Sequence, residues 1–358
     1  MKTYKNIVFD PSYVGSPGDD LNMFQGFKAQ LLSTYDLEKI KPILYHLKEV
    51  LNNGDEDNYN WMIKHLAHIV QKPYIKTGNA IVNWGEKGAG KNALWEWFGT
   101  SIIGEKHYVY LNNINDLTGQ FTSLFAFGIF VILDEAVFSG GHLVHNMLKS
   151  LITQMTQKLE KKGVDPILIK NYMNLFFLSN NPDPVKIEGS NCRRYDVKEV
   201  SDKHVKDHVY FDALNQDTAN HFYTFLMEQD ISKYRTGCAP MTTDKMDMAV
   251  YSMKPIEVFV EELLEGEIIY KKTSWNINEK IKIPDQYFEA GERYEITMKE
   301  LWDFYNTFLD SKSAGDRIER KTKLSFSKEI RRLLKIENVS KDRHNGCPIF
   351  LTIEKKID

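Results

Sequence analysis

The chain has 358 residues, of which 42% are apolar and 27% are charged, and its formal net charge is −3. This length exceeds what one compact core usually holds, so we expect two or three domains. No apolar run approaches the roughly 20 residues of a membrane-spanning helix, and the N-terminus lacks the apolar stretch of a secretory signal. Because the net charge is negative, nucleic acid would have to be held by local basic patches.

The cysteines Cys192, Cys238 and Cys347 are few, odd in number and far apart. This pattern fits a reducing compartment better than a disulfide framework or a zinc site. We therefore expect a cytoplasmic protein with no membrane partner.

Residues 1–30 contain several glycines and prolines and are expected to form an extended lead-in. Apolar residues then recur every three or four positions in residues 36–51 and 58–70, which predicts two helices before Pro73. We group residues 1–75 as an N-terminal helical segment. Its apolar faces either contact a neighbouring subunit, which we favour, or pack within the chain.

Residues 76–235 form the second predicted domain, in which short apolar runs alternate with helical patterns. The most apolar run is short and rich in β-branched residues, as a fully buried parallel strand would be. Strands that alternate with helices predict an α/β domain around a parallel sheet. Strands are expected at 79–84, 108–111, 127–136 and 174–179, and helices at 92–99 and 142–155.

Residues 236–358 form the third predicted domain. Residues 238–255 show little helical signal and are expected to be a loop, and an acidic helix at 256–267 follows. After Tyr294 come two short helices and a terminal strand, the order of a small winged-helix module. Residues 311–345 hold eleven Lys and Arg against five Asp and Glu. This excess fits a surface for phosphate backbones or, alternatively, a solvated helix face.

The segment from Gly85 to Lys91 has the spacing G-x-x-x-x-G-K between a predicted strand and a predicted helix. Such a turn directs several backbone N–H groups at one phosphate, and the helix N-terminus and the lysine add positive charge. Glycine turns without this function are common, but the context favours a phosphate-binding loop. The expected nucleotide-binding residues are Gly85, Glu86, Lys87, Gly88, Ala89, Gly90, Lys91, Asn92 and Ala93.

Asn92 stands where such a loop usually has Ser or Thr, whose hydroxyl binds Mg²⁺. Its amide oxygen has a similar reach, so we count Asn92 among the expected metal ligands for Mg²⁺ with ATP. The buried strand further on ends in Asp134 and Glu135. Two adjacent carboxylates at such a tip are costly to desolvate, which favours a function over a solvated strand end. We assign Asp134 to the metal and Glu135 to activation of the attacking water.

Two further polar positions belong to this predicted site. Asn180 follows the next apolar strand, where it either senses the γ-phosphate or merely belongs to a turn; we favour the sensor. Arg193 and Arg194 precede another strand-like run. They either reach the nucleotide of a neighbouring subunit as an arginine finger or form an ordinary solvated pair.

Lys158, Lys161 and Lys162 lie in a segment that reads as a β-hairpin with its tip near Gly163. A basic hairpin is usually only a soluble turn. If this one projects into the channel of a ring, however, its lysines would contact phosphate backbones without regard to sequence.

In this order of parts the chain resembles the superfamily 3 helicases, which are AAA+-type ring ATPases of viruses, phages and plasmids. The parts are the phosphate loop, the strand ending in Asp-Glu, the lysine hairpin, the strand ending in Asn, and the arginines. The match is nearest to the poxvirus- and phage-type primase-helicase branch, on "LNMFQGF", "LKSLIT" and "CRRYDVKEVSD" as well as on the stretch that precedes the loop. It covers about residues 20–265.

The resemblance implies an AAA+-like P-loop NTPase, an N-terminal helical segment and a C-terminal winged-helix-like domain. It implies a homo-hexameric ring that binds ATP and Mg²⁺ between subunits and moves along single-stranded or forked DNA. It assigns catalytic roles to Lys91, Asp134, Glu135, Asn180 and Arg193 or Arg194, and DNA contacts to Lys161 and Lys162, with Lys149 as a helper and Lys158 beside them.

Two features depart from the family. Asn92 replaces the hydroxyl residue, and no primase domain precedes the predicted helicase. Either a separate primase or polymerase is the partner that primes, or the chain is a fragment of a longer primase-helicase, or it is a stand-alone helicase. The main hypothesis is an ATP-dependent DNA helicase of a viral, phage or mobile-element replication system. The alternative is a DNA-binding replication initiator or loader that ATP switches and that does not unwind DNA. An ATPase unrelated to nucleic acid is a third hypothesis.

Overall fold

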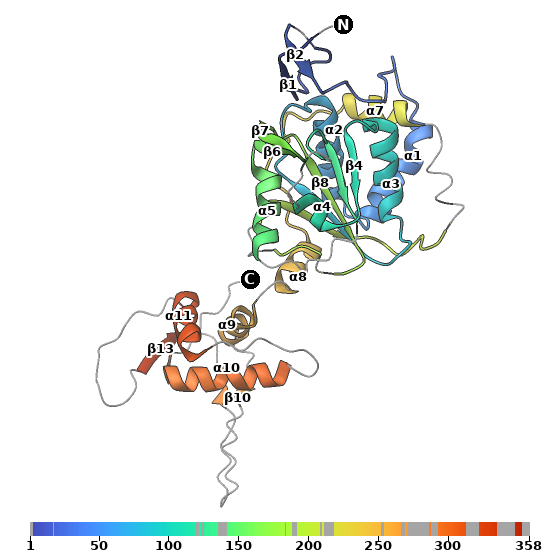
Figure 1. Ribbon diagram of the computed structural model, residues 1–358. Helices are drawn as coiled ribbons and strands as arrows, with labels where there is room; N and C mark the ends of the chain where they lie inside the picture. Colours follow the sequence, from blue (N-terminus) through green and yellow to red (C-terminus); the bar gives the residue numbers. More distant parts are fainter. Residues whose placement is uncertain are drawn as a thin grey trace, which may run out of the picture. The chain divides into compact units, whose positions relative to one another are not determined.

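The structure is a computed structural model of the chain (Figure 1). It describes residues 3–16, 18–118, 122, 125–134, 142–182, 184–187, 192–207, 210, 218–251, 254–265, 269–270, 286–287, 293–312, 322–334 and 348–352.

The chain divides into two compact units, Met1–Ser252 and Met253–Asp358. The predicted boundary at residues 235 and 236 lies inside the first unit. Within the described part of the chain, no helix has the length and apolar character needed to cross a membrane.

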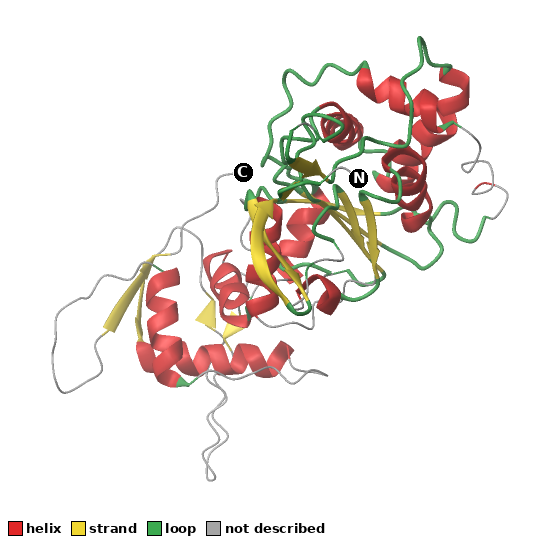
Figure 2. Cartoon of the chain, turned by 45° about the horizontal axis from the view of Figure 1, so that its top comes forward, coloured by secondary structure: helices red, strands yellow, loops and turns green. Residues whose placement is uncertain are grey.

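Unit 1 is built on a five-stranded parallel sheet, as the alternation of strands and helices predicts. The strand order is β4-β5-β8-β3-β9, so β3 lies between β8 and the edge strand β9. Figures 1 and 2 show the strands of the sheet with helices packed around them. The strands are β3 (Ala80–Trp84), β4 (Tyr108–Leu111), β5 (Phe130–Leu133), β8 (Asn174–Ser179) and β9 (Tyr195–Glu199).

Helices cover both faces of this sheet, because neighbouring residues along each strand point to opposite faces. Phe176 joins a core with the helices of one face, and Phe177 joins a core with the helices of the other. The first face carries α1 (Leu37–Tyr45), the π-helix η1 (His46–Leu51), α2 (Glu56–Gln71), α3 (Lys91–Trp97), the π-helix η2 (Phe98–Ile103) and α7 (Ala219–Met227). The second carries α4 (Ile114–Thr118), α5 (His142–Thr153) and α8 (Thr243–Tyr251).

Two small sheets accompany the central one. The predicted hairpin is present as β6 (Thr156–Lys161) and β7 (Val164–Lys170), which are antiparallel and joined by Lys162 and Gly163. Near the N-terminus, β1 (Asn6–Val8) pairs in parallel with β2 (Asp20–Asn22).

The expectation of a loop over residues 238–255 was wrong, because α8 occupies Thr243–Tyr251. Its backbone starts at Thr242, whose hydroxyl accepts a hydrogen bond from the backbone N–H of Lys245. Met248 and Ala249 are buried against the sheet. Packing on the sheet therefore stabilises a helix whose own apolar pattern is weak.

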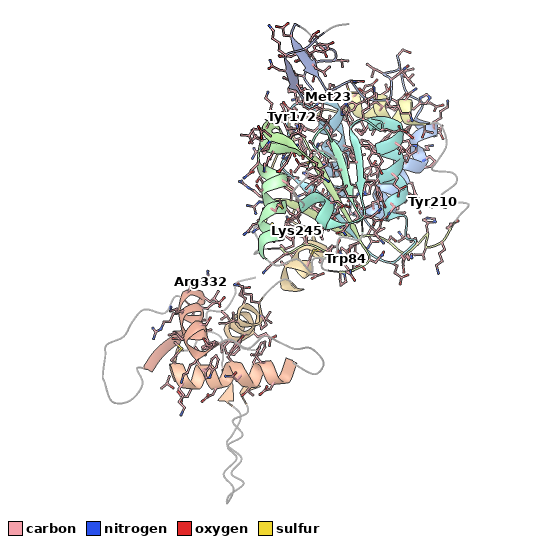
Figure 3. The ribbon with its side chains drawn as sticks, viewed as in Figure 1. Met23, Trp84, Tyr172, Tyr210, Lys245 and Arg332 are labelled. Atoms are coloured by element: carbon pink, nitrogen blue, oxygen red, sulfur yellow. The ribbon has the colours of Figure 1, made fainter. Side chains whose placement is uncertain are left out.

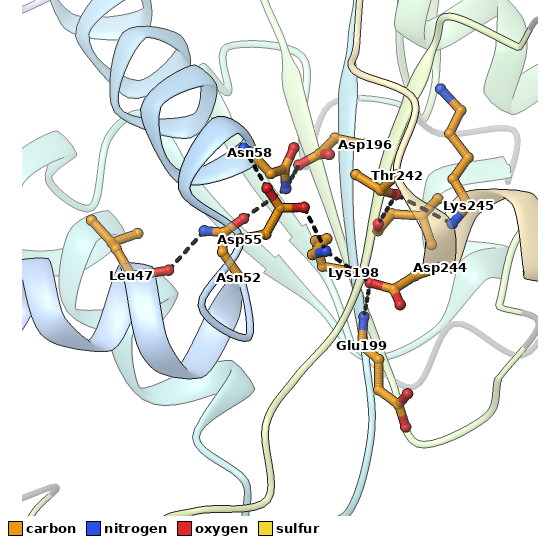
Figure 4. A network of polar contacts seen from close by, with 11 residues as sticks. Leu47, Asn52, Asp55, Asn58, Asp196, Lys198, Glu199, Thr242, Asp244 and Lys245 are labelled. Atoms are coloured by element: carbon orange, nitrogen blue, oxygen red, sulfur yellow. Dashed lines mark hydrogen bonds and ion pairs between the residues drawn. The ribbon is translucent and has the colours of Figure 1, made fainter.

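An ionic network around the buried Lys198 ties α2 and α8 to the edge strand β9 (Figure 4). The Lys198 ammonium lies 3.0 Å from an Asp55 carboxylate oxygen and 3.1 Å from one of Asp244. Asp55 also caps α2 by accepting from the backbone N–H of Asn58. Because these three charges come from three segments, the network fixes the start of α2 against the sheet.

Unit 2 has a helical core of its own. Phe259 packs against Phe304, Tyr305 and Phe308, and Tyr305 stacks on Phe326. β12 was not predicted and pairs with β13 in antiparallel fashion. The elements are α9 (Pro255–Glu265), β10 (Ile269–Tyr270), β11 (Gln286–Tyr287), β12 (Arg293–Thr297), α10 (Met298–Lys312), α11 (Lys323–Leu333) and β13 (Pro348–Thr352).

Candidate functional site

The glycine-rich turn joins β3 directly to α3. Gly85, Gly88 and Gly90 have φ values of 147°, 88° and 91°, a region that residues with a side chain rarely adopt. A Cβ atom on Gly85 would also lie 3.1 Å from the carbonyl oxygen of Val200. Glycine is thus required at this turn both by backbone geometry and by close approach of the segment after β9.

Lys91 is the first residue of α3, and its side chain folds back over the turn. Its ammonium donates hydrogen bonds to the carbonyl oxygens of Gly85 at 2.7 Å and Glu86 at 2.6 Å, and to Asn180 Oδ1 at 3.0 Å. Burial lowers the pKa of Lys91, and the charges of Asp134 and Glu86 oppose that shift. Lys91 and the predicted sensor Asn180 are therefore in contact, although 89 residues separate them in the sequence.

Asp134 follows β5 at the same edge of the sheet. One of its oxygens accepts hydrogen bonds from Asn92 Nδ2 at 2.6 Å and from the Tyr110 hydroxyl at 2.5 Å. Asn92 Nδ2 also donates to the Tyr110 hydroxyl oxygen at 2.9 Å. Burial, followed by the bond to Asp134, raises the pKa of Tyr110, so the phenol stays protonated and acts as a donor.

Asn92 was expected to coordinate a metal through its amide oxygen. In the structure its amide nitrogen faces Asp134, so Asn92 holds the carboxylate in place, and coordination would require the amide to turn. Asp134 itself fits Mg²⁺, which binds proteins through one or two carboxylates and takes its other ligands from phosphates and water. The described residues contain no cluster of three or more His, Cys, Asp or Glu, a donor set that a magnesium-nucleotide site does not need.

These side chains line one open pocket of about 330 Å³. Its walls combine the turn, the start of α3 and the tips of β5 and β8. The glycine turn, one lysine and one carboxylate thus meet at the carboxyl edge of a parallel sheet, where ligands of such sheets bind. The lining residues are Lys87, Gly88, Gly90, Lys91, Asn92, Ala93, Asp134 and Asn180.

Sequence reasoning missed Tyr110 and Glu96 in this site. Burial, followed by the charge of Asp134, raises the pKa of Glu96, and Asn92 and Tyr110 partly oppose that shift. Glu96 follows Asn92 by one helical turn, a spacing visible in the sequence. Tyr110 lies in β4, whose register places it opposite Ile132 of β5, and that pairing could not be read from the sequence.

Hydrogen bonds from two other segments also hold the glycine turn, and they were not predicted from the sequence. His46 Nε2 donates to the Gly90 carbonyl at 3.2 Å, and His46 Nδ1 lies 2.9 Å from the Tyr210 hydroxyl, labelled in Figure 3. The Tyr210 ring stacks on His204 with 3.7 Å between ring centroids. In the same segment, the backbone N–H of Lys206 donates to the Gly88 carbonyl at 3.2 Å. The N-terminal helical segment therefore holds the carbonyl next to Lys91.

Some predicted residues do not join this pocket. Glu135 lies outside the described residues. Arg193 and Arg194 lie just before β9, at the amino end of the sheet, whereas the pocket lies at the carboxyl end. Trp84, at the carboxyl end of β3, and Tyr172, just before β8, mark these two ends in Figure 3. The arginines cannot serve the pocket of their own chain from there.

The hairpin lysines whose side chains the structure describes are not among the residues that line the pocket. Lys162 is exposed in the two-residue turn, while Lys158 pairs with Glu160 at 2.5 Å. Lys161 ends β6, and its side chain lies outside the described residues. Lys149 is half-buried on α5.

Comparison with known proteins gives three findings. A family of unknown function, DUF5906, matches residues 84–194, which include the glycine turn, Asp134 and Asn180. A DNA primase-polymerase of Nitratiruptor phage NrS-1 is 32% identical over 216 residues. That alignment covers 56% of this chain but only 29% of the phage protein, so the chain spans less than a third of that relative.

Solved structures of the C-terminal region of the NrS-1 protein (residues 305–718 of that protein) share the fold. The apo structure has a TM-score of 0.69 at 21% identity and covers 98% of this chain and 85% of that one. A second form has a TM-score of 0.67 with the same identity and coverage. The chain thus has the fold of that region and is similar in sequence to a phage DNA primase-polymerase.

Proposed function

We propose that the chain is a P-loop ATPase that drives a DNA helicase in phage replication. The observation that carries the proposal is the convergence of Lys91, Asn180 and the Asn92–Asp134 pair in one pocket that a glycine turn borders. A lysine beside backbone N–H groups suits the β- and γ-phosphates of a nucleoside triphosphate. The similarity to a phage DNA primase-polymerase supports a substrate related to DNA.

The chain's own groups would divide the chemistry as follows. Lys91 would exchange its carbonyl partners Gly85 and Glu86 for phosphate oxygens. Asn180 would keep the ammonium in place and contact the terminal phosphate, while Glu135 would orient and deprotonate the attacking water. Asp134 would hold Mg²⁺, which neutralises phosphate charge when it is bound.

A ring would explain the position of the arginines. Arg193 and Arg194 lie at the opposite end of the sheet from the pocket, so they suit the nucleotide of an adjacent copy. The exposed Lys162 at the hairpin turn suits the phosphate backbone of a DNA strand. In this proposal, triphosphate cleavage between subunits moves the hairpins along that strand.

Assays of unwinding and ATP turnover test this proposal. The wild-type chain should unwind a forked duplex, with ATP turnover that single-stranded DNA stimulates. The Glu135→Gln variant should bind ATP without cleaving it. The paired change of Lys161 and Lys162 to Ala should abolish unwinding and spare ATP binding. Unwinding that persists in Glu135→Gln would refute the coupling of strand movement to triphosphate cleavage.

The second candidate is a DNA-binding replication protein that ATP switches between assembly states. The observation that favours it is in unit 2, where α11 presents Lys323, Lys328 and Arg332 as exposed side chains. Such a helix suits phosphate backbones independently of the hairpin. Changing these three residues to Ala should abolish DNA binding under this candidate, whereas under the helicase proposal the change of Lys161 and Lys162 should have the larger effect.

A further inference from the structure

A second pocket lies on unit 1 and shares no lining residue with the first. It has a volume of about 520 Å³ and lies between α2 and the segment 233–238. Its lining residues are Asp57, Asn60, Trp61, Lys64, Lys233, Tyr234, Arg235 and Cys238.

The walls of this pocket combine aromatic rings with positive charge. Lys64, Lys233 and Arg235 face a single lining carboxylate, Asp57. Among the described residues, none of the three cations forms an ion pair or a hydrogen bond with a carboxylate; Asp230 acts on the two lysines only through its charge at longer range. Lys233 and Arg235 are exposed and Lys64 is half-buried, and all three can take an anion without first breaking a contact with a carboxylate.

The aromatic wall is held in position before any ligand arrives. Tyr234 lies 6.1 Å from Trp61 between ring centroids, and its hydroxyl is 2.8 Å from His65 Nδ1. Trp61 stacks on His65 at 4.9 Å with 25° between the ring planes. Burial lowers the pKa of His65 to about 3, so this histidine stays neutral and adds no charge to the pocket. The neutral imidazole of His65 therefore packs against the indole of Trp61 and holds it in place.

Both sides of the pocket are anchored to the sheet. On one side, Asp55 fixes the start of α2 through Lys198 (Figure 4). On the other, the backbone N–H of Gly237 donates to the Thr77 carbonyl at 2.7 Å, and that of Ala239 donates to the Arg193 carbonyl at 2.9 Å. The pocket is thus a fixed feature of unit 1 that neighbours the predicted arginine finger.

From this combination we infer that the pocket binds one nucleotide unit, with the base against Trp61 and Tyr234 and the phosphate among Lys64, Lys233 and Arg235. Rigid aromatic rings beside cations are the elements with which proteins hold single-stranded nucleic acid, because every base has a π-face and every nucleotide an anionic phosphate. The pocket is of a size to take one such unit. The nucleotide belongs either to a DNA strand or to a free mononucleotide, and the inference does not depend on cleavage of ATP in the first pocket.

The first test asks whether the nucleotide belongs to a DNA strand. Fluorescence anisotropy measures binding of a labelled 15-mer of oligodeoxythymidylate to the 358-residue chain in the absence of ATP. The triple variant Lys64→Ala/Lys233→Ala/Arg235→Ala should bind at least about tenfold more weakly, and the slope of log affinity against log salt should become less steep by about 0.7 or more. Trp61→Leu should weaken binding at least about fivefold, since one stacked base contributes that much. Trp61→Phe, which keeps a ring, should restore most of the affinity.

The matched control is Lys39→Ala/Lys41→Ala/Lys106→Ala, which removes the same charge from exposed positions of unit 1 outside the pocket. It should change the affinity less than twofold, and the thermal unfolding of all variants should be compared to detect loss of fold. A fluorescent ATP analogue tests the other source. If Lys91→Ala retains analogue binding that the pocket triple variant then removes, the ligand is a mononucleotide. The inference is overturned if the pocket triple variant behaves like the control triple toward both probes, or if Trp61→Leu and Trp61→Phe bind equally well.

Discussion

The ammonium of Lys91 lies 3.0 Å from the side-chain oxygen of Asn180. The lysine begins the helix after β3 and the asparagine follows β8, which pairs with β3 in parallel. The register of the two strands brings their carboxyl ends to one edge, and the contact follows from it. Asn180 thereby holds the charge that the proposed triphosphate must meet.

Asn180→Ala should lower the rate constant of ATP cleavage at least about tenfold while changing the affinity for ATP by only a few-fold, because the glycine turn and Lys91 remain. Single-turnover phosphate release gives the rate constant, and titration with a fluorescent ATP analogue gives the affinity. Asn181→Ala is the matched control, since the contact of Lys91 is with Asn180 and Asn181 contributes its backbone N–H to Ser179. Equal effects of the two changes would rule out a specific role for Asn180.

Tyr110→Phe should raise the concentration of Mg²⁺ needed for half-maximal ATP cleavage. The change removes a 2.5 Å hydrogen bond to Asp134, and a bond to a charged group contributes about 1.5–3 kcal/mol. Tyr108→Phe removes a hydroxyl from the same strand two residues earlier and leaves the Asp134 bond intact. Titration of both variants with MgCl₂ checks the prediction, which fails if Tyr108→Phe shifts the magnesium requirement as far as Tyr110→Phe does.

Gly85→Ala should abolish ATP binding and destabilise unit 1 by more than about 1 kcal/mol. The new Cβ would lie 3.1 Å from a backbone oxygen of Val200, and a φ of 147° is strained for alanine. Gly15→Ala introduces the same methyl group at a φ of 98° with no atom within 4 Å, so it should cost only the backbone strain. Chemical denaturation of both variants gives the comparison. A Gly85→Ala protein as stable as Gly15→Ala would contradict the close approach at Val200.

His46 should make the fold sensitive to acid. Burial lowers its pKa to about 4, although its bond to Gly90 acts in the other direction. The unfolded chain takes up this proton near pH 6.5, so between pH 6.5 and 4 the unfolded state binds more protons. The free energy of unfolding should therefore fall by about 1.4 kcal/mol per pH unit on account of this group as the pH drops through that window.

His46→Gln isolates this contribution when denaturation is measured from pH 7 to 4. Two other buried groups also make the free energy of unfolding depend on pH. Burial raises the pKa of Asp196 to about 7, so its contribution has the opposite sign to that of His46. Burial lowers the pKa of His65 to about 3, so its contribution has the same sign. Both residues remain in the variant and cancel in the difference. Identical pH slopes for the two proteins would show that His46 is not held neutral.

The local parts of the structure followed from the sequence, and the long-range parts did not. The strand before Gly85, the turn and the helix at Lys91 are contiguous, so their residue types and periodicity predicted them. The Tyr110–Asp134 bond and the His46–Gly90 bond depend on strand register and helix docking, which no local pattern encodes. Helix α8 was not predicted because its formation also depends on long-range contacts. Its apolar residues gain their packing partners only when the sheet is formed.

The central claim is that the pocket at Lys91 binds and cleaves a nucleoside triphosphate. Measuring phosphate release from Mg·ATP tests this claim most directly. The measurement is made with and without single-stranded DNA for the wild-type chain, for Lys91→Ala and for the exposed control Lys106→Ala. The account predicts turnover that DNA stimulates in the wild type and in Lys106→Ala, and at least about a hundredfold loss in Lys91→Ala. Turnover in Lys91→Ala equal to that of the wild type, or no turnover in the wild type under any of these conditions, would contradict it.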